Sequence, residues 1–101
     1  MITLTVSYPK AEGSTFDLDY YLTTHIPMVA GSLGDSVSRT TLTSGVDFGD
    51  QPTPFMIVIQ FEIDSMESLG AAFAAHGDEI MGDIPNFTNV VPVVHVGTVI
   101  S

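Results

Sequence analysis

The run from Phe55 to Ile63 constrains the fold most, because it is apolar on both of its faces. Its odd positions read Phe, Ile, Ile, Phe and Ile, and its even positions begin with Met56 and Val58. Successive side chains of a strand point to opposite faces of a sheet, so this pattern predicts a central strand. One face should lie against a packed layer. The apolar side chains on the other face indicate that it is covered as well.

Three further strands are predicted from alternation and composition. The run from Ile2 to Tyr8 alternates apolar residues with Thr and Ser, which is the pattern of a strand with one apolar face. Residues 36–46 are rich in Thr and Val and residues 90–100 are rich in Val, so both runs are predicted strands. The length of 101 residues allows one domain, which we expect to span residues 1–101.

The first predicted helix begins near Phe16, where the apolar period changes from two residues to that of a helix. Its predicted buried stripe consists of Leu18, Tyr21, Leu22, His25, Ile26 and Val29. Pro27 interrupts this pattern, because proline removes one helical hydrogen bond and crowds the preceding turn. We therefore expect a kink or an irregular turn there, with Gly31 and Gly34 ending the helix.

The second predicted helix follows the apolar strand. Asp64 lies three residues before Glu67, which is the spacing of a capping box, so the helix should begin there. An Ala-rich run further along favours the helix. Its predicted buried side chains are Met66, Leu69 and Phe73.

The order of elements is β-α-β-β-α-β, which predicts the α+β class and a ferredoxin-like fold. In that fold two helices cover one face of a four-stranded antiparallel sheet and leave the other face bare. Met56 and Val58 would lie on the bare face, where apolar side chains favour packing against another surface. A second copy of the chain is the simplest partner, since two-fold homodimers are the commonest oligomers. The sequence therefore predicts a homodimer.

The charge balance excludes several classes of partner. The chain has 12 acidic and two basic residues, with a formal net charge of −10. Nucleic acids and anionic membranes are bound by clustered Lys and Arg, and Lys10 and Arg39 are the only basic residues here. We therefore expect neither nucleic-acid nor membrane binding. The low proportion of charged residues, 14%, favours a dimer that handles neutral, apolar molecules.

Cysteine is absent, which excludes disulfides, a thiol nucleophile and cysteine-based metal sites. The segment MITLTVSYPK lacks the basic region of a signal peptide, and no apolar run reaches the roughly 20 residues that span a bilayer. A cytoplasmic location is expected. The spacing of His25, His76 and His95 matches no metal motif, and no phosphate-binding glycine motif occurs. Neither a metal nor a cofactor is predicted.

His25 and Tyr21 are the candidate catalytic residues. They lie one helical turn apart on the predicted buried stripe, so an imidazole and a phenol share a face. A histidine in an apolar pocket can pass protons to and from a substrate, and a tyrosine can donate a hydrogen bond to a developing oxyanion. The alternative is that His25 only bonds a backbone carbonyl, such as one freed by Pro27.

Five further side chains are predicted to bind the ligand: Leu18, Leu22, Tyr8, His95 and Phe87. Leu18 and Leu22 belong to the stripe of the first helix. His95 shares a face of the last strand with Gly97, whose missing side chain leaves room for a ligand or for another backbone. The alternative for His95 is structural packing. His76 lies at the border of the second helix stripe and is expected to face solvent.

The segment FDLDYYLTTHIPMV contains the pattern F-D-x-x-Y-Y-x-x-x-H-x-P, and on this pattern the chain resembles the EthD family. That family is named for a component of ethyl tert-butyl ether degradation. Two further segments, DIPNFT (83–88) and FEIDSME (61–67), also resemble it. The resemblance implies a dimeric α+β barrel, in which two ferredoxin-like sheets meet on the faces away from their helices. It also implies that His25 is a pocket residue between helix and sheet.

Two main functions follow as hypotheses. The first is cofactor-free acid/base chemistry, of isomerase, cyclase or lyase type, on a small apolar carbonyl or aromatic metabolite in a degradation or oxidation pathway. Relatives with the implied barrel include polyketide cyclases, muconolactone isomerases and monooxygenases. The second is a non-catalytic protein that sequesters a hydrophobic metabolite or delivers it to a partner oxygenase. A third hypothesis is an accessory subunit that acts through its surface and not through a pocket.

Overall fold

Strand β3 (Phe55–Ile63) lies inside a four-stranded antiparallel sheet, at the bounds predicted for it. In the computed structural model, which describes residues 1–101, it pairs with β1 (Ile2–Pro9) and with β2 (Val37–Ser44). Strand β4 (Val93–Thr98) pairs with the other edge of β1, so the strand order is β2-β3-β1-β4. The predicted α+β class and ferredoxin-like sheet are thereby confirmed.

Both edge strands are shorter than the predicted runs. Strand β2 lies within the predicted 36–46, and β4 lies within the predicted 90–100. Pro92 directly precedes β4, and proline has no N–H with which to join a strand ladder. The prediction from Val content alone therefore extended the last strand too far towards its N-terminal side.

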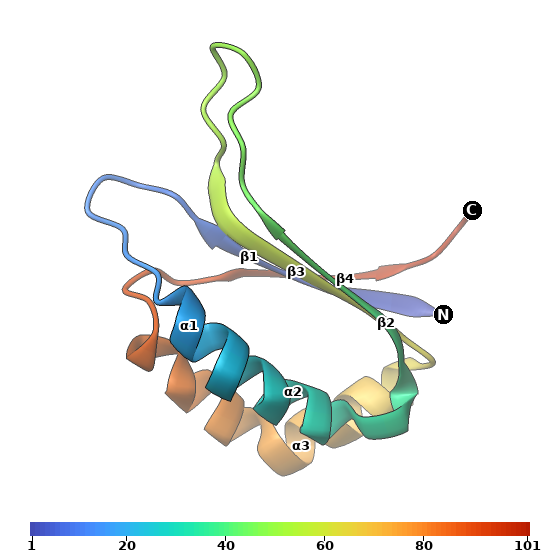
Figure 1. Cartoon of the computed structure of the whole chain (residues 1–101). Helices are drawn as coiled ribbons and strands as arrows, with labels where there is room; N and C mark the ends of the chain where they lie inside the picture. Colours follow the sequence, from blue (N-terminus) through green and yellow to red (C-terminus); the bar gives the residue numbers. More distant parts are fainter.

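Two helical segments cover one face of the sheet (Figure 1). The first runs through α1 (Leu18–Tyr20), the π-helical turn η1 (Tyr21–His25) and α2 (Ile26–Leu33), followed by the 3-10 turn η2 (Gly34–Ser36). The second is α3 (Met66–Asp83), continued by the 3-10 turn η3 (Ile84–Asn86). The prediction of two helices on one face is confirmed. None of the helices combines the length and the apolar character needed to cross a membrane.

Pro27 is accommodated by a wide helical turn on its N-terminal side. In η1 the Ile26 N–H donates to the Tyr21 carbonyl, five residues back. Pro27 then stands in the first turn of α2, where a missing N–H is tolerated. The expected irregularity is therefore present, but it precedes the proline. The helix continues through Gly31, contrary to prediction, and ends at Gly34, whose φ of 58° favours glycine.

The buried stripe of the first helix is narrower than predicted. Four side chains at four-residue intervals are buried: Tyr21, His25, Val29 and Leu33. Leu18 and Leu22 are 41% and 45% exposed, so their predicted burial on the stripe is wrong. A regular helix alternates intervals of three and four residues along its buried face. Here the interval is four throughout η1 and α2, and Leu18 and Leu22 lie beside this line on the solvent side.

Helix α3 is capped one residue later than predicted. The Ser65 hydroxyl, and not the Asp64 carboxylate, accepts the Ser68 N–H at 3.1 Å. The predicted capping box at Asp64 is therefore wrong. Asp64 belongs to the preceding connection, where its N–H donates to the Ser36 carbonyl at 3.0 Å. This backbone bond aligns Asp64 with the end of η2 and leaves the cap to the next residue.

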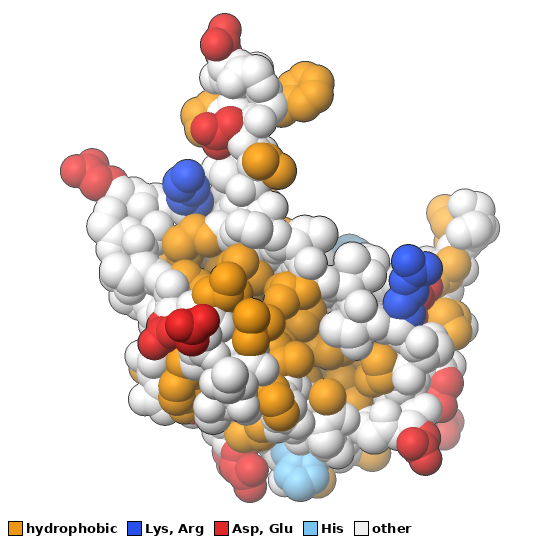
Figure 2. All heavy atoms as spheres, in the orientation of Figure 1, with side chains coloured by type: hydrophobic (Ala, Val, Ile, Leu, Met, Phe, Trp, Pro, Cys, Tyr) orange, Lys and Arg blue, Asp and Glu red, His pale blue; other side chains and the backbone are white.

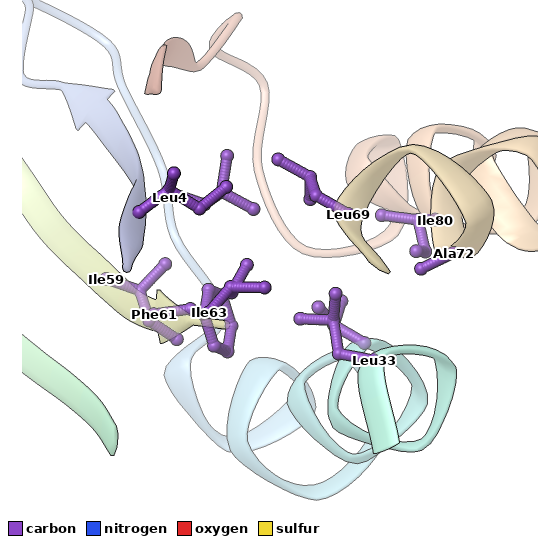
Figure 3. Close-up of a cluster of buried hydrophobic side chains, with 10 residues drawn as sticks. Leu4, Leu33, Ile59, Phe61, Ile63, Leu69, Ala72 and Ile80 are labelled. Carbon is purple, nitrogen blue, oxygen red and sulfur yellow. The ribbon is translucent and has the colours of Figure 1, made fainter. Parts of the chain in front are cut away.

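The main core lies between the sheet and the two helices, and Figure 3 shows side chains from both layers pointing into it. Its members are Ile2, Leu4, Val29, Leu33, Ile59, Phe61, Ile63, Leu69, Ala72 and Ile80. Complete burial of one large apolar side chain contributes roughly 1.5–3 kcal/mol. Phe73 packs against this core half-buried. Met66, the first residue of α3, is 54% exposed, so its predicted burial is wrong.

The sheet face opposite the helices is only partly covered. Val58, which pairs with Ser7 and Thr43, lies on it and is half-buried. The sequence predicts Met56 on the same face, but Met56 lies at a shift in the strand register and packs against the cluster that contains Tyr8 and Ile57. The connection between β2 and β3, residues 45–54, projects away from the helices and is called the hairpin arm below (Figure 1). It carries Val46 and Phe48, which are 84% and 86% exposed. Figure 2 shows hydrophobic side chains standing out on this arm beside acidic ones.

Gly45→Ala is expected to destabilise the protein, because a Cβ at this position would overlap the Phe55 carbonyl oxygen. That backbone oxygen can retreat only if the base of the hairpin arm opens. The Gly45 N–H donates to the Met56 carbonyl at 2.9 Å in the same place. We expect the free energy of unfolding, measured by urea denaturation, to fall by about 1–3 kcal/mol.

Gly70→Ala is the matched control. Gly70 lies inside α3, and nothing stands within 4 Å of the Cβ that alanine adds. Glycine in a helix is less favourable than alanine by about 0.5–1 kcal/mol, so this variant should gain that much stability. A Gly45→Ala protein as stable as wild type would contradict the close backbone approach at the hairpin arm.

Candidate functional site

Aromatic side chains meet where the end of β1, the start of the first helix and the segment after α3 come together. The rings of Tyr8, Phe16, Tyr21 and Phe87 pack against one another with centroids 4.9 to 5.7 Å apart. The backbone supports this meeting, since the Asp17 N–H donates to the Phe87 carbonyl at 2.7 Å. The structure therefore brings together Tyr8, Tyr21 and Phe87 from the predicted site.

His25 joins this cluster from the last position of η1. Its ring stacks on Tyr21, with centroids 5.5 Å apart and planes 16° from parallel. The Phe87 ring lies 4.6 Å from it on centroids. The His25 side chain is only 4% exposed. An imidazole and a phenol thus share a buried face of the helix.

Asp83, the last residue of α3, binds the His25 ring. Its Oδ2 lies 2.9 Å from His25 Nδ1. Its Oδ1 accepts the Tyr20 hydroxyl at 2.6 Å and the Asn86 side-chain amide at 3.0 Å. The partner of His25 is therefore a carboxylate, and not the backbone carbonyl that the alternative interpretation expected.

Asp83 is a site residue that sequence reasoning missed. The available signal was the segment DIPNFT, which begins with Asp83 and contains Asn86 and Phe87. All three residues belong to the site. Asp83 and His25 are 58 residues apart in the chain, so no spacing rule along one helix could pair them.

The protonation of this network follows from its hydrogen bonds. Burial raises the pKa of Asp83, but the hydrogen bonds from Tyr20, Asn86 and His25 outweigh it and hold the pKa below its ordinary value. The hydrogen bond to Asp83 in turn raises the pKa of Tyr20. An ionised carboxylate only accepts hydrogen bonds, so His25 Nδ1 must carry a proton and donate it. In the neutral ring, Nε2 then holds the lone pair.

A cavity of about 180 Å³ lies between the sheet and the helices, beside His25. Its walls are mainly aliphatic, and only Tyr8, Tyr21 and His25 bring polar side-chain groups to it. Burial raises the pKa of Tyr8 and that of Tyr21, so both phenols stay protonated and can donate. An apolar cavity of about 150 Å³ holds benzene. This cavity therefore has room for a molecule with a single ring.

The cavity opens near the end of α3. Met81, Ile84 and Pro92 line both the cavity and a groove on the outside of the molecule. Met81 is 52% exposed, which places it at the rim. A ligand would therefore enter between the last turn of α3 and the segment that precedes β4.

Four of the five predicted ligand-binding side chains do not line the cavity. One of them, Phe87, packs against the His25 ring instead. Leu18 and Leu22 are outside the cavity and half-exposed to solvent. His95 pairs in register with Thr5, which lies on the sheet face opposite the helices. The sheet therefore separates His95 from His25 within one chain. The alternation of the last strand indicated which residues share a face with His95, but not which face turns towards the helices.

The side chains of His76 and Asp17 lie outside the cavity. His76 is exposed on α3, as expected. Asp17 caps the first helix, where its side chain accepts the Tyr20 N–H at 3.1 Å. No group of three or more His, Cys, Asp or Glu side chains converges in a way that could hold a metal ion.

Several solved structures, among them the following three, are similar to the chain. An EthD-like protein from Ralstonia eutropha is 37% identical, with a TM-score of 0.90 over 99% of this chain and 92% of that one. An ethyl tert-butyl ether degradation (EthD) family protein from Bacillus halodurans is 19% identical, with a TM-score of 0.69 over 99% of both chains. An antibiotic biosynthesis monooxygenase is 17% identical, with a TM-score of 0.60 over 100% of both chains. No family model and no curated protein matches the chain.

The lowered pKa of Asp83 predicts a contribution to stability that acid removes. Its folded pKa lies below the unfolded value of about 3.9. The contribution is therefore complete above that value and is lost as the pH falls through the folded pKa. Asp83→Asn should be less stable than wild type at pH 7, and this difference should shrink on acidification towards about pH 2.

Urea unfolding at both pH values measures this difference. Asp78→Asn removes the same charge from an exposed position of α3 and controls for the change in net charge. If the gap between wild type and Asp83→Asn has the same size at both pH values, the network around Asp83 does not stabilise its ionised form.

Proposed function

The chain belongs to the EthD family, and from the geometry of its site we propose that it performs cofactor-free acid/base chemistry on a small apolar carbonyl or aromatic metabolite. The reaction is of isomerase, cyclase or lyase type. The observation that supports this proposal is the surroundings of the two nitrogens of the His25 ring. Asp83 binds its Nδ1, no protein group binds its Nε2, and the ring lines the apolar cavity.

In the proposed mechanism, His25 Nε2 takes a proton from the carbon next to the substrate carbonyl. The electron pair of the broken C–H bond forms the enolate, and its oxygen accepts a hydrogen bond from the Tyr21 or Tyr8 hydroxyl. Asp83 stabilises the imidazolium that results. Return of the proton to a different carbon completes an isomerisation. Departure of a leaving group from the enolate completes a lyase reaction.

The charge of the site favours a neutral substrate. No Lys or Arg lines the cavity, and the Asp83 carboxylate lies directly behind His25. An anion in this apolar cavity would lose its hydration without gaining a cationic partner, which is strongly unfavourable. The net charge of −10 also repels anions at a distance. The volume of about 180 Å³ limits the substrate to roughly one ring.

Non-catalytic carriage is the second candidate function, and the walls of the cavity favour it. Thirteen of the 15 lining residues are hydrophobic, so an apolar ligand can be held without any reaction at His25. In that case the protein would sequester a hydrophobic metabolite or deliver it to a partner oxygenase. The two functions differ in whether the bound molecule changes chemically.

His25→Ala tests the acid/base role. Single-ring ketones and phenols are first screened for binding by thermal shift, and their conversion by the wild type is then followed by mass spectrometry. Loss of the general base should lower the turnover rate by about 10²–10⁴-fold. His76→Ala removes an exposed histidine of α3 and should leave the rate unchanged.

Equal rates for wild type and a folded His25→Ala protein would contradict the catalytic assignment. A ligand that the wild type binds and returns unchanged after hours, with no product, would favour carriage. Both outcomes are read from the same mass spectra.

We also propose that two copies pair through the sheet faces opposite their helices. Val58 gives this face an apolar side chain that one chain leaves half-exposed. The hairpin arm extends on the same side with Val46 and Phe48 in solvent. Removing this surface from water stabilises by roughly 25 cal/mol per Å² of apolar area. The barrel implied by the EthD resemblance has this arrangement.

Light scattering after size-exclusion chromatography should then give a mass twice the 10.8 kDa of the chain. Val58→Glu places a charge on the bare face and should shift the protein to monomer. Ala74→Glu adds the same charge to the exposed side of α3 and should not. A wild type that stays monomeric at high concentration contradicts the proposed pairing.

A further inference from the structure

We propose that Asp83 is the positioning residue of the His25 site, holding the neutral imidazole in the tautomer with its proton on Nδ1 and its lone pair on Nε2. The consequence for turnover rests on the proposed acid/base function. The tautomer itself can be measured without any substrate. No Lys or Arg side chain contacts the Asp83 carboxylate, so His25 is its only basic partner.

Two hydrogen bonds that do not involve His25 hold the Asp83 carboxylate in place. Its Oδ1 accepts two donors from different elements: the Tyr20 hydroxyl of α1 at 2.6 Å and the Asn86 amide of η3 at 3.0 Å. This leaves Oδ2 for His25 Nδ1 at 2.9 Å. Because both donors hold Oδ1, Oδ2 cannot swing away from the ring without breaking them. The hydrogen bonds from Tyr20 and Asn86 therefore orient the carboxylate so that Oδ2 faces His25 Nδ1.

The other groups around His25 offer Nδ1 no competing hydrogen bond. Tyr21 stacks on the ring at 5.5 Å between centroids, and Phe87 tilts against it at 4.6 Å. Tyr8 of β1 packs against Tyr21 and lines the cavity. These aromatic contacts restrict the plane of the imidazole and do not select its tautomer. That selection falls to Asp83.

A purely structural role is the competing interpretation. Through Tyr20 and His25, Asp83 joins the end of α3 to the first helix, so its loss would loosen the packing in either case. Loss of stability or of activity therefore does not separate the two roles. The position of the proton on the His25 ring does, because packing alone does not set it.

Long-range ¹H–¹⁵N NMR of the histidine rings is the test. The chain has three histidines, so comparison with His25→Ala assigns the His25 signals. At a pH where the ring is neutral, wild type should show a protonated Nδ1 and an unprotonated Nε2. Asp83→Asn should shift the population towards the Nε2–H tautomer, because an amide can donate to Nδ1 as well as accept from it.

Two control variants accompany this measurement. Tyr20→Phe keeps the carboxylate, and Asp78→Asn removes an exposed carboxylate from the same helix. Both should retain the Nδ1–H tautomer. Where a substrate is turned over, Asp83→Asn should lower kcat about 10- to 100-fold with little change in KM.

A wild-type His25 that carries its proton on Nε2 would overturn the proposal, even if Asp83→Asn does not fold. A folded Asp83→Asn protein with an unchanged tautomer would overturn it as well. If the tautomer shifts as expected but His25→Ala keeps full turnover, the positioning role stands and the proposed acid/base function fails. The two proposals are thus tested separately.

Discussion

The Asp83 carboxylate joins the two helical segments at one end of the molecule, and the geometry of the site depends on it. It accepts hydrogen bonds from Tyr20, His25 and Asn86, which come from three different elements. The aromatic cluster packs beside this junction, so the ring of His25 is held both in its plane and at one nitrogen. The other nitrogen is left for the cavity. A small apolar space with one oriented imidazole is the result.

The π-helical turn is the second element of this arrangement. It ends at His25, two residues before Pro27, which cannot donate the backbone hydrogen bond of a regular helix. Wide turns of this kind are frequent at functional sites, because they shift side chains relative to a regular helix. Here Tyr21 and His25 occupy its two ends and both face the cavity. Pro27, which disturbs helix geometry, therefore lies close to the turn that contains His25, the candidate base.

Most of the fold could be predicted from periodicity. The apolar run of β3 has its predicted bounds, and the order of elements leads to the observed sheet with two helices on one face. The errors are local. A regular helix would bury Leu18 and Leu22, but the buried side chains of this helix follow four-residue intervals that leave both exposed. Ser65 caps α3 in place of Asp64 because a backbone bond holds Asp64 in the preceding connection.

Three properties can be inferred from the order of residues alone: the class of fold, the shared face of Tyr21 and His25, and the lack of any cationic cluster for an anionic partner. These properties depend on local period and on composition, which are read along the chain. Two further properties emerge when the chain folds: Asp83 binds His25, and the sheet separates His95 from His25. The physical reason is that these relations join residues far apart in the chain. Hydrogen bonds and burial depend on distances in space. The local period of apolar residues does not indicate which face of the sheet the helices cover, or which helix ends lie next to each other.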